Sequence, residues 1–199
     1  MTKIGKAKIA ILATHGFEQD ELMVPQRKLQ EAGAEVVVVS PQGGQIRGWK
    51  HKDWGESVSV DQLLDAAKAD EYDAIVLPGG QINPDLLRVN AQALQFIRSF
   101  LDAGKVVAAI CHAPWLLVEL DAVRDLQITS YKSIKTDVVN AGGKWVDRAV
   151  VTDRGIVTSR NPGDLDAFCA KIVEEIEEGN HSRRRGARAQ KGESRPAVH

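Results

Sequence analysis

Short apolar runs rich in β-branched residues constrain the fold of this chain more than any other feature. They lie at residues 8–13 (KIAILA), 36–40 (VVVVS), 73–77 (DAIVL) and 106–110 (VVAAI). Such runs are typical of strands that are buried on both faces of a sheet. Helical apolar stripes separate them; one covers residues 91–103 and is followed by Gly104. This alternation predicts an α/β fold in which a mostly parallel sheet carries helices on both faces.

The same alternation continues along the second half of the chain. It predicts helices at residues 114–120, 134–141 and 165–178, and strands at 127–130, 146–152 and 156–159. Between the second and third apolar runs, three glycines predict a turn region, and residues 57–60 suit one further short strand.

The length of 199 residues allows one domain of roughly 150 residues, and we expect it to cover residues 1–180. Residues 181–199 are basic and offer little apolar surface to bury, so we expect a disordered tail. Its charged residues are Arg183, Arg184, Arg185, Arg188, Lys191 and Arg195, against Glu193 alone. Because this tail has no aromatic ring for base stacking, we expect no nucleic-acid binding.

Several protein classes are excluded by composition and motif spacing. No apolar run reaches the roughly 20 residues of a membrane-spanning helix, and we expect a cytoplasmic protein that does not contact a membrane. The five histidines lack the spacing of a zinc site, and no GxGxxG follows a strand. We therefore expect neither a metal nor a cofactor.

Candidate catalytic residues gather where the predicted parallel strands end. Glu18 follows the first strand, Gly79 and Gly80 follow the third, and Cys111 and His112 follow the fourth. In an open parallel sheet, active residues collect at the carboxyl ends of the strands. The sequence therefore predicts a site that combines a thiol, an imidazole, a carboxyl group and backbone N–H groups.

Cys111 is the candidate nucleophile of this site. It lies between a buried strand and a helix that begins near Pro114, and the positive end of a helix dipole favours a thiolate. The alternative is a small buried core residue, which is the usual role of a single cysteine at a strand end. The second cysteine, Cys169, lies on the apolar stripe of the last helix and is interpreted as core packing.

The other candidates also have plain structural interpretations. Gly79 and Gly80 let backbone N–H groups approach a ligand, as an oxyanion hole requires, but they equally suit a tight turn. Glu18 precedes a helix, where a carboxylate is commonly a favourable N-terminal charge. His112 is placed to move a proton, although neighbouring side chains at a turn often point apart.

Several motifs in order along residues 8–178 resemble the ThiJ/PfpI superfamily. They are GFEQDEL, VLPGG, AICHAP, TSYKSIKTDVVNAGGKWVD and TSRNPGDLDAF. The sequence is most similar to the PfpI-type intracellular proteases and general stress proteins, which are related to the Parkinsonism-associated deglycase. The resemblance implies a three-layer sandwich of the class I glutamine amidotransferase-like, or flavodoxin-like, type.

The resemblance also implies roles for individual residues. Cys111 matches the family nucleophile, His112 its neighbouring histidine, Glu18 the buried glutamate that hydrogen-bonds the sulfur, and Gly80 an oxyanion-hole glycine. An acidic residue from a neighbouring subunit completes the triad in the PfpI branch, and Asp85 stands at that position. We therefore expect a homodimer or hexamer with the active site near a subunit interface.

Two departures from the family pattern bear on these roles. Asp85 replaces a glutamate, and the loop before it is one residue longer, which changes its reach toward His112. Ala113 replaces the glycine of the usual CHGP motif, which narrows the space beside the nucleophile.

Two functions follow from this site. The first is a cysteine-dependent stress-protection enzyme that hydrolyses reactive carbonyl compounds in the manner of a deglycase or glyoxalase, or that cleaves peptides. Its partner would be a small carbonyl substrate or a peptide. The alternative is a non-catalytic oxidative-stress sensor or chaperone in which Cys111 is oxidised.

Overall fold

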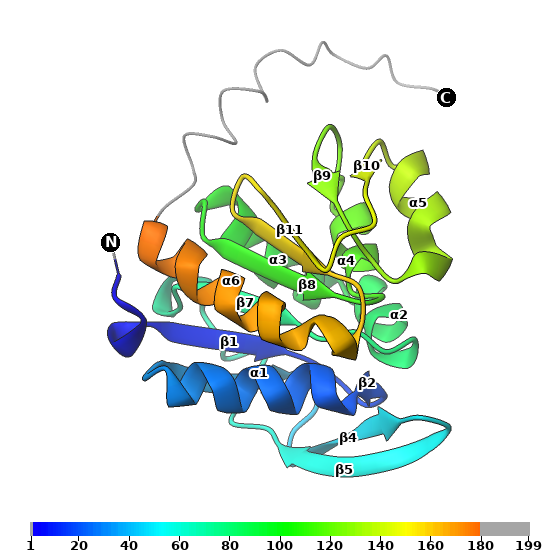
Figure 1. Ribbon diagram of the computed structural model, residues 1–199. Coiled ribbons are helices and arrows are strands. Elements are labelled where there is room, and N and C mark those ends of the chain that lie inside the picture. Colours follow the sequence, from blue (N-terminus) through cyan, green and yellow to red (C-terminus); the bar gives the residue numbers. More distant parts are fainter. Residues whose placement is uncertain (1, 180–199) are drawn as a thin grey trace, which may run out of the picture.

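A seven-stranded sheet forms the centre of the computed structural model, which describes residues 2–179 (Figure 1). The strand order is β11-β12-β8-β7-β1-β3-β6, and every neighbouring pair is parallel except β11 and β12. The strands are β1 (Lys8–Leu12), β3 (Glu35–Ser40), β6 (Gln62–Leu63), β7 (Ala74–Leu77), β8 (Val106–Ile110), β11 (Val150–Asp153) and β12 (Ile156–Ser159). The predicted tail lies outside the described residues.

Helices cover both faces of this sheet, as predicted. On one face lie α1 (Gln19–Glu31) and α6 (Leu165–Glu178), and on the other lie α3 (Ala91–Asp102) and α4 (Pro114–Glu119) (Figure 1). Two further short helices, α2 (Ile82–Arg88) and α5 (Lys135–Asn140), follow β7 and β9 in the chain. The 3-10 turns are η1 (Ile4–Lys6), η2 (Ala69–Glu71), η3 (Lys132–Ile134) and η4 (Pro162–Asp164). The α/β class and the three-layer sandwich are confirmed.

Among residues 2–179, no helix combines the length and the apolar character needed to cross a bilayer.

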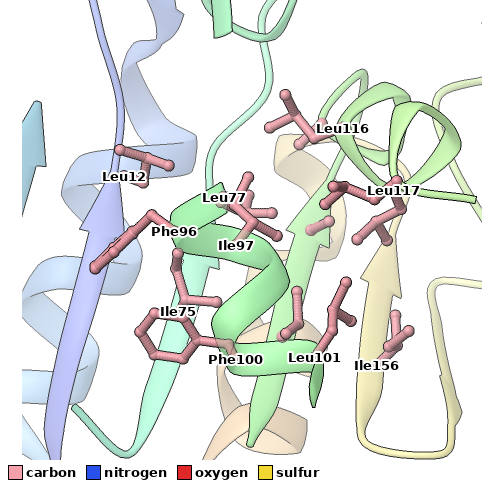
Figure 2. Close-up of a cluster of buried hydrophobic side chains, with 14 of the residues drawn as sticks. Leu12, Ile75, Leu77, Phe96, Ile97, Phe100, Leu101, Leu116, Leu117 and Ile156 are labelled. Atoms are coloured by element: carbon pink, nitrogen blue, oxygen red, sulfur yellow. The ribbon is translucent and has the colours of Figure 1, made fainter. Parts of the chain in front are cut away.

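The core is split by the sheet into two layers because successive strand side chains point to opposite faces. In β1, Ala10 and Leu12 pack toward α3, whereas Ile9 and Ile11 pack toward α1 and α6. The layer under α3 contains the rings of Tyr72, Phe96 and Phe100, and Figure 2 shows the Phe100 ring next to Ile75. Burial on both faces explains why these strands appear in the sequence as continuous apolar runs.

Three elements differ from the sequence prediction. The glycine-containing region forms a hairpin of β4 (Gln45–Lys50) and β5 (Asp53–Ser59), which joins β2 (Phe17–Glu18) in a small separate sheet. Helix α2 fills the segment after Gly80, where no helix was predicted. The strand predicted at residues 146–152 is divided into β10 (Lys144–Trp145), which pairs with β9 (Gln127–Ile128), and β11.

Candidate active site

Cys111 lies at the sharp turn between β8 and α4. Its backbone has φ +63°, a left-handed conformation that costs a non-glycine residue on the order of 1 kcal/mol. Three hydrogen bonds hold the turn: Cys111 N–H donates to the Ser159 carbonyl (3.1 Å), Ala113 N–H to the Ile110 carbonyl (3.0 Å) and Tyr131 N–H to the Cys111 carbonyl (2.8 Å). The backbone at Cys111 is therefore strained and is held in place by hydrogen bonds from two neighbouring segments. Strained backbone of this kind is frequent at functional sites.

The Cys111 sulfur has an imidazole as its neighbour. Sγ lies 3.1 Å from Nδ1 of His112, although the two residues are adjacent in the chain. Burial lowers the pKa of His112, so the ring is neutral near pH 7 and is able to accept a proton. The opposite ring nitrogen, Nε2, lies 3.0 Å from Oγ of Ser133. The thiol thus faces a neutral base at hydrogen-bond distance.

Glu21, on the first turn of α1, contacts the same thiol. Its side chain is fully buried beside the Cys111 side chain, while its Oε2 accepts the Gly79 N–H at 2.8 Å. Burial and the nearby charge of Glu18 raise the pKa of Glu21 well above its ordinary value. This shift favours the neutral form of the Glu21 carboxyl group, whose Oε1 makes no hydrogen bond within residues 2–179.

Two backbone N–H groups complete the surroundings of sulfur. Those of Gly80 and His112 are both directed at the Cys111 side chain. Gly80 has φ +80°, and an added Cβ would lie 2.6 Å from the Gly16 carbonyl oxygen, so this approach requires glycine. The two N–H groups are able to donate hydrogen bonds to an oxyanion on the carbon that becomes bonded to sulfur.

Comparison with known proteins places this geometry in a family. The sequence profile of the DJ-1/PfpI family matches residues 7–175. The chain belongs to the DJ-1/PfpI family. It is 43% identical over 166 residues to the deglycase PfpI of Pyrococcus furiosus, a match that covers 83% of this chain and 97% of that protein. It is likewise 43% identical over 164 residues to protein/nucleic acid deglycase 2 of Escherichia coli strain K12, covering 81% and 92%.

A solved structure of the DJ-1/PfpI family has the same fold. Drosophila melanogaster DJ-1beta superposes with a TM-score of 0.78 at 28% sequence identity, covering 87% of this chain and 95% of that one. These matches confirm both the resemblance of the sequence motifs to the ThiJ/PfpI superfamily and the flavodoxin-like fold that it implied.

Glu21, and not Glu18, lies beside the Cys111 side chain. Glu18 is the N-cap of α1, and its Oε2 accepts the N–H of Glu21 at 2.9 Å. One helical turn later, Glu21 lies on the face of α1 that packs against the sheet, beside Leu22 and Pro25. The prediction chose the wrong carboxyl group because the helix begins at Gln19, which turns Glu18 toward its own backbone.

The expected ionisation of Cys111 and the expected role of Gly79 also change. Burial raises the pKa of the Cys111 thiol, because a charged sulfur loses its hydration, and the neighbouring Glu21 raises it further. The N–H of Gly79 already donates to Glu21, which leaves Gly80 and His112 as the two N–H groups at sulfur.

Asp85 is exposed on α2, and within one chain His112 contacts Cys111 and Ser133 instead. A contact from a neighbouring subunit stays a prediction. Residues 2–179 contain no cluster of three or more side chains suited to a metal ion.

Sequence reasoning did not find two side chains around His112. The Tyr131 ring stacks on the imidazole with ring centroids 4.8 Å apart, and Ser133 contacts Nε2. Both lie in the segment between β9 and α5, inside the motif TSYKSIKTDVVNAGGKWVD, but residue type alone does not show that the fold brings this segment to His112. Glu21 did have a signal: a charged residue within the apolar stripe of an amphipathic helix.

Proposed function

We propose that this protein is a cysteine-dependent hydrolase of the PfpI deglycase type that acts on reactive carbonyl compounds. The observation that carries the proposal is the 3.1 Å contact between Cys111 Sγ and Nδ1 of neutral His112, at a backbone turn strained to φ +63°. A strained nucleophile beside a base is a recurrent arrangement in nucleophilic catalysis. The deglycase names of two relatives support the substrate class.

The reaction would begin with a thiol rather than a resting thiolate. As sulfur attacks the carbonyl carbon of a small α-oxoaldehyde or of its adduct with an amine, the thiol proton passes to Nδ1 of His112. The S–C bond forms and the carbonyl π bond breaks, leaving an oxyanion that accepts hydrogen bonds from the N–H groups of Gly80 and His112. The Glu21 side chain lies beside the sulfur, and its neutral form would donate a hydrogen bond that stabilises the negative charge during proton transfer.

The burial of the site favours small substrates. Cys111 is 5% exposed and His112 is 4% exposed, so a carbonyl of two or three carbons fits the approach better than a polypeptide backbone. Peptide cleavage also needs an acid for the leaving amine, and the third group expected to support it, Asp85, makes no contact with His112 inside one chain. We therefore rank peptidase activity below carbonyl hydrolysis.

The alternative function, an oxidation sensor or a chaperone, receives less support from the site. Peroxide attacks thiolates, whereas the buried Cys111 has a raised pKa and stays protonated near pH 7. A proton acceptor at 3.1 Å serves a catalytic step, and a sensor has no need of it.

The test compares the wild-type protein, Cys111→Ser and Cys169→Ala on methylglyoxal and on a fluorogenic peptide. We expect Cys111→Ser to lower kcat/KM for methylglyoxal by at least roughly 10³-fold, as removal of a nucleophile does in comparable enzymes. Cys169→Ala is the matched control, since it removes the other buried thiol, and it should retain wild-type turnover. Equal rates for wild type and Cys111→Ser would refute the proposal.

A further inference from the structure

His112 has partners on both ring nitrogens within its own chain. Nδ1 lies 3.1 Å from Sγ of Cys111, and Nε2 lies 3.0 Å from Oγ of Ser133. The imidazole is buried, whereas Ser133, in the 3-10 turn η3, is largely exposed. The hydroxyl of an otherwise solvent-facing residue therefore reaches the second nitrogen of a candidate general base.

We propose that Ser133 is a positioning residue that holds His112 in the tautomer whose Nδ1 lone pair faces the Cys111 thiol. The proposal rests on the proposed function, in which Nδ1 accepts the thiol proton. In this proposal, Ser133 of the same chain orients His112, whereas the family resemblance led us to expect an acidic residue of a second subunit in that role.

The tautomer follows from the donors and acceptors present. A neutral imidazole carries one N–H, and the protonated thiol has a hydrogen to donate, so Nδ1 must be the acceptor and Nε2 must carry the proton. The Nε2–H group then donates to Ser133 Oγ. After the thiol proton has moved to Nδ1, Nε2–H still donates to the same oxygen. Ser133 thus fits the ring both before and after proton transfer.

Other contacts fix the plane of the ring but not its two-fold orientation. Tyr131 stacks on His112 with an interplanar angle of 24°, and Trp115 meets the ring edge-on, with centroids 5.2 Å apart. A half-turn about the Cβ–Cγ bond would preserve both ring contacts and would exchange nitrogen for carbon beside sulfur. Only the hydrogen bonds distinguish the two orientations, and the bond to Ser133 is the one that proton transfer leaves in place.

The segment that carries Ser133 is fastened to the turn that carries the nucleophile. Tyr131 N–H donates to the Cys111 carbonyl at 2.8 Å, two residues before Ser133. Farther back, Thr129 N–H donates to Oγ1 of Thr158 at 3.0 Å, in the strand next to β8. The segment that carries Ser133 is therefore held at the strand ends of the sheet by two hydrogen bonds.

A serine hydroxyl at Nε2 affects the charge of the His112 ring differently from a carboxylate. A carboxylate at Nε2 would stabilise the imidazolium, whereas a hydroxyl accepts the hydrogen bond without adding charge. A carboxylate brought by a second copy would also have to displace Ser133 from Nε2, because Nδ1 is already occupied by sulfur.

The experiment compares Ser133→Ala, Ser133→Thr and the control Thr136→Ala, which removes an exposed hydroxyl on α5. Three quantities are measured: the ¹⁵N chemical shifts of the His112 ring, assigned with His112→Gln; the rate of Cys111 carbamidomethylation by iodoacetamide at pH 7.5; and kcat/KM for methylglyoxal. Thermal denaturation checks that each variant is folded.

We expect the wild-type ring to show the Nε2–H tautomer and Ser133→Ala to show a mixture of tautomers. Cys111 alkylation and kcat/KM should both fall about tenfold in Ser133→Ala, the usual effect of one lost hydrogen bond to a reacting group. Ser133→Thr should restore all three to within about twofold, and Thr136→Ala should match the wild type.

Unchanged ring shifts and an unchanged alkylation rate in Ser133→Ala would overturn the proposal. The proposal would also be overturned if Asp85→Asn lowered the alkylation rate and kcat/KM while Ser133→Ala changed neither. That result would assign the orienting role to the acidic residue. The ring shifts and the alkylation rate do not depend on the substrate. If methylglyoxal turnover were absent in every variant, the proposed function would fail while these two measurements still decided the role of Ser133.

Discussion

The two cysteines of this chain are nearly equally buried, and yet their surroundings differ in every other respect. Cys111 is 5% exposed and Cys169 is 4% exposed. Cys169 lies in the middle of α6, in regular helix, and burial raises the pKa of its thiol to about 11. Cys111 occupies a left-handed turn among an imidazole, a carboxyl group and two directed N–H groups.

Resting ionisation therefore does not distinguish a candidate nucleophile from a packing residue in this protein. Burial raises the pKa of both thiols, so neither is a standing thiolate near pH 7. What Cys111 has and Cys169 lacks is a neutral imidazole at 3.1 Å, which takes the thiol proton in the reaction proposed above. The chemistry belongs to the pair and not to the sulfur alone.

The largest expected effect concerns this base. In His112→Gln, the rate of Cys111 alkylation by iodoacetamide at pH 7.5 should fall about 100-fold, which is the low end of the contribution of a positioned general base. The rate at Cys169 should stay as it is in the wild type. Peptide mass spectrometry of time points measures both cysteines in one sample. An unchanged rate at Cys111 would show that its reactivity does not come from His112.

The next effect is a pH dependence that originates at Glu21. The folded-state pKa of Glu21 is raised, so its contribution to stability is complete below the ordinary glutamate pKa and is lost as pH rises toward the folded-state pKa. Glu21→Gln stays neutral and still offers an oxygen to the Gly79 N–H. We expect the free energy of unfolding of the variant, relative to wild type, to increase by on the order of 1 kcal/mol between pH 4.5 and pH 8.

Urea denaturation at the two pH values measures this change, and Glu18→Gln is the matched control. Glu18 is only partly buried, and its cap on α1 accepts one backbone N–H, so its variant should show a smaller drift with pH. The same drift in both variants would mean that the buried carboxyl group is not the source.

The smallest expected effect is at the second cysteine. Cys169→Ala removes a sulfur that packs in α6, which should lower the free energy of unfolding by about 1 kcal/mol and the Tm by about 2–4 °C. Turnover of methylglyoxal should be unchanged to within about twofold. Differential scanning calorimetry and steady-state kinetics on one preparation test both statements, and a large loss of activity would bring Cys169 into the site.

Sequence patterns were sufficient for the sheet but not for the side chains that meet at its edge. The buried strands were predictable because burial on both faces leaves continuous apolar runs, as in β7 and β8. Cys111 and His112 were predictable because they directly follow one of these runs. Only the end of the β4–β5 hairpin was predicted, as a short strand at residues 57–60, because its glycines and exposed polar residues have no apolar period.

The choice between Glu18 and Glu21 shows why the rest could not be predicted. The two differ by one helical turn, and helix ends are the least certain part of a sequence-based assignment. If the start of the helix is misplaced by one turn, Glu18, which caps the helix, is mistaken for Glu21, which faces the thiol. The position of Ser133 depends on the course of the chain between β9 and α5, which local patterns do not determine.

The strand order has a consequence for the timing of activity during folding. Glu21, Gly80, Cys111 and Ser133 come from four separate parts of the chain, and they meet only after β1, β7 and β8 have paired side by side. A nascent or partly melted chain therefore holds a cysteine with neither its base nor its hydrogen-bond donors in place. The arrangement of base and hydrogen-bond donors around Cys111 is therefore a property of the finished sheet and of no single segment of the chain.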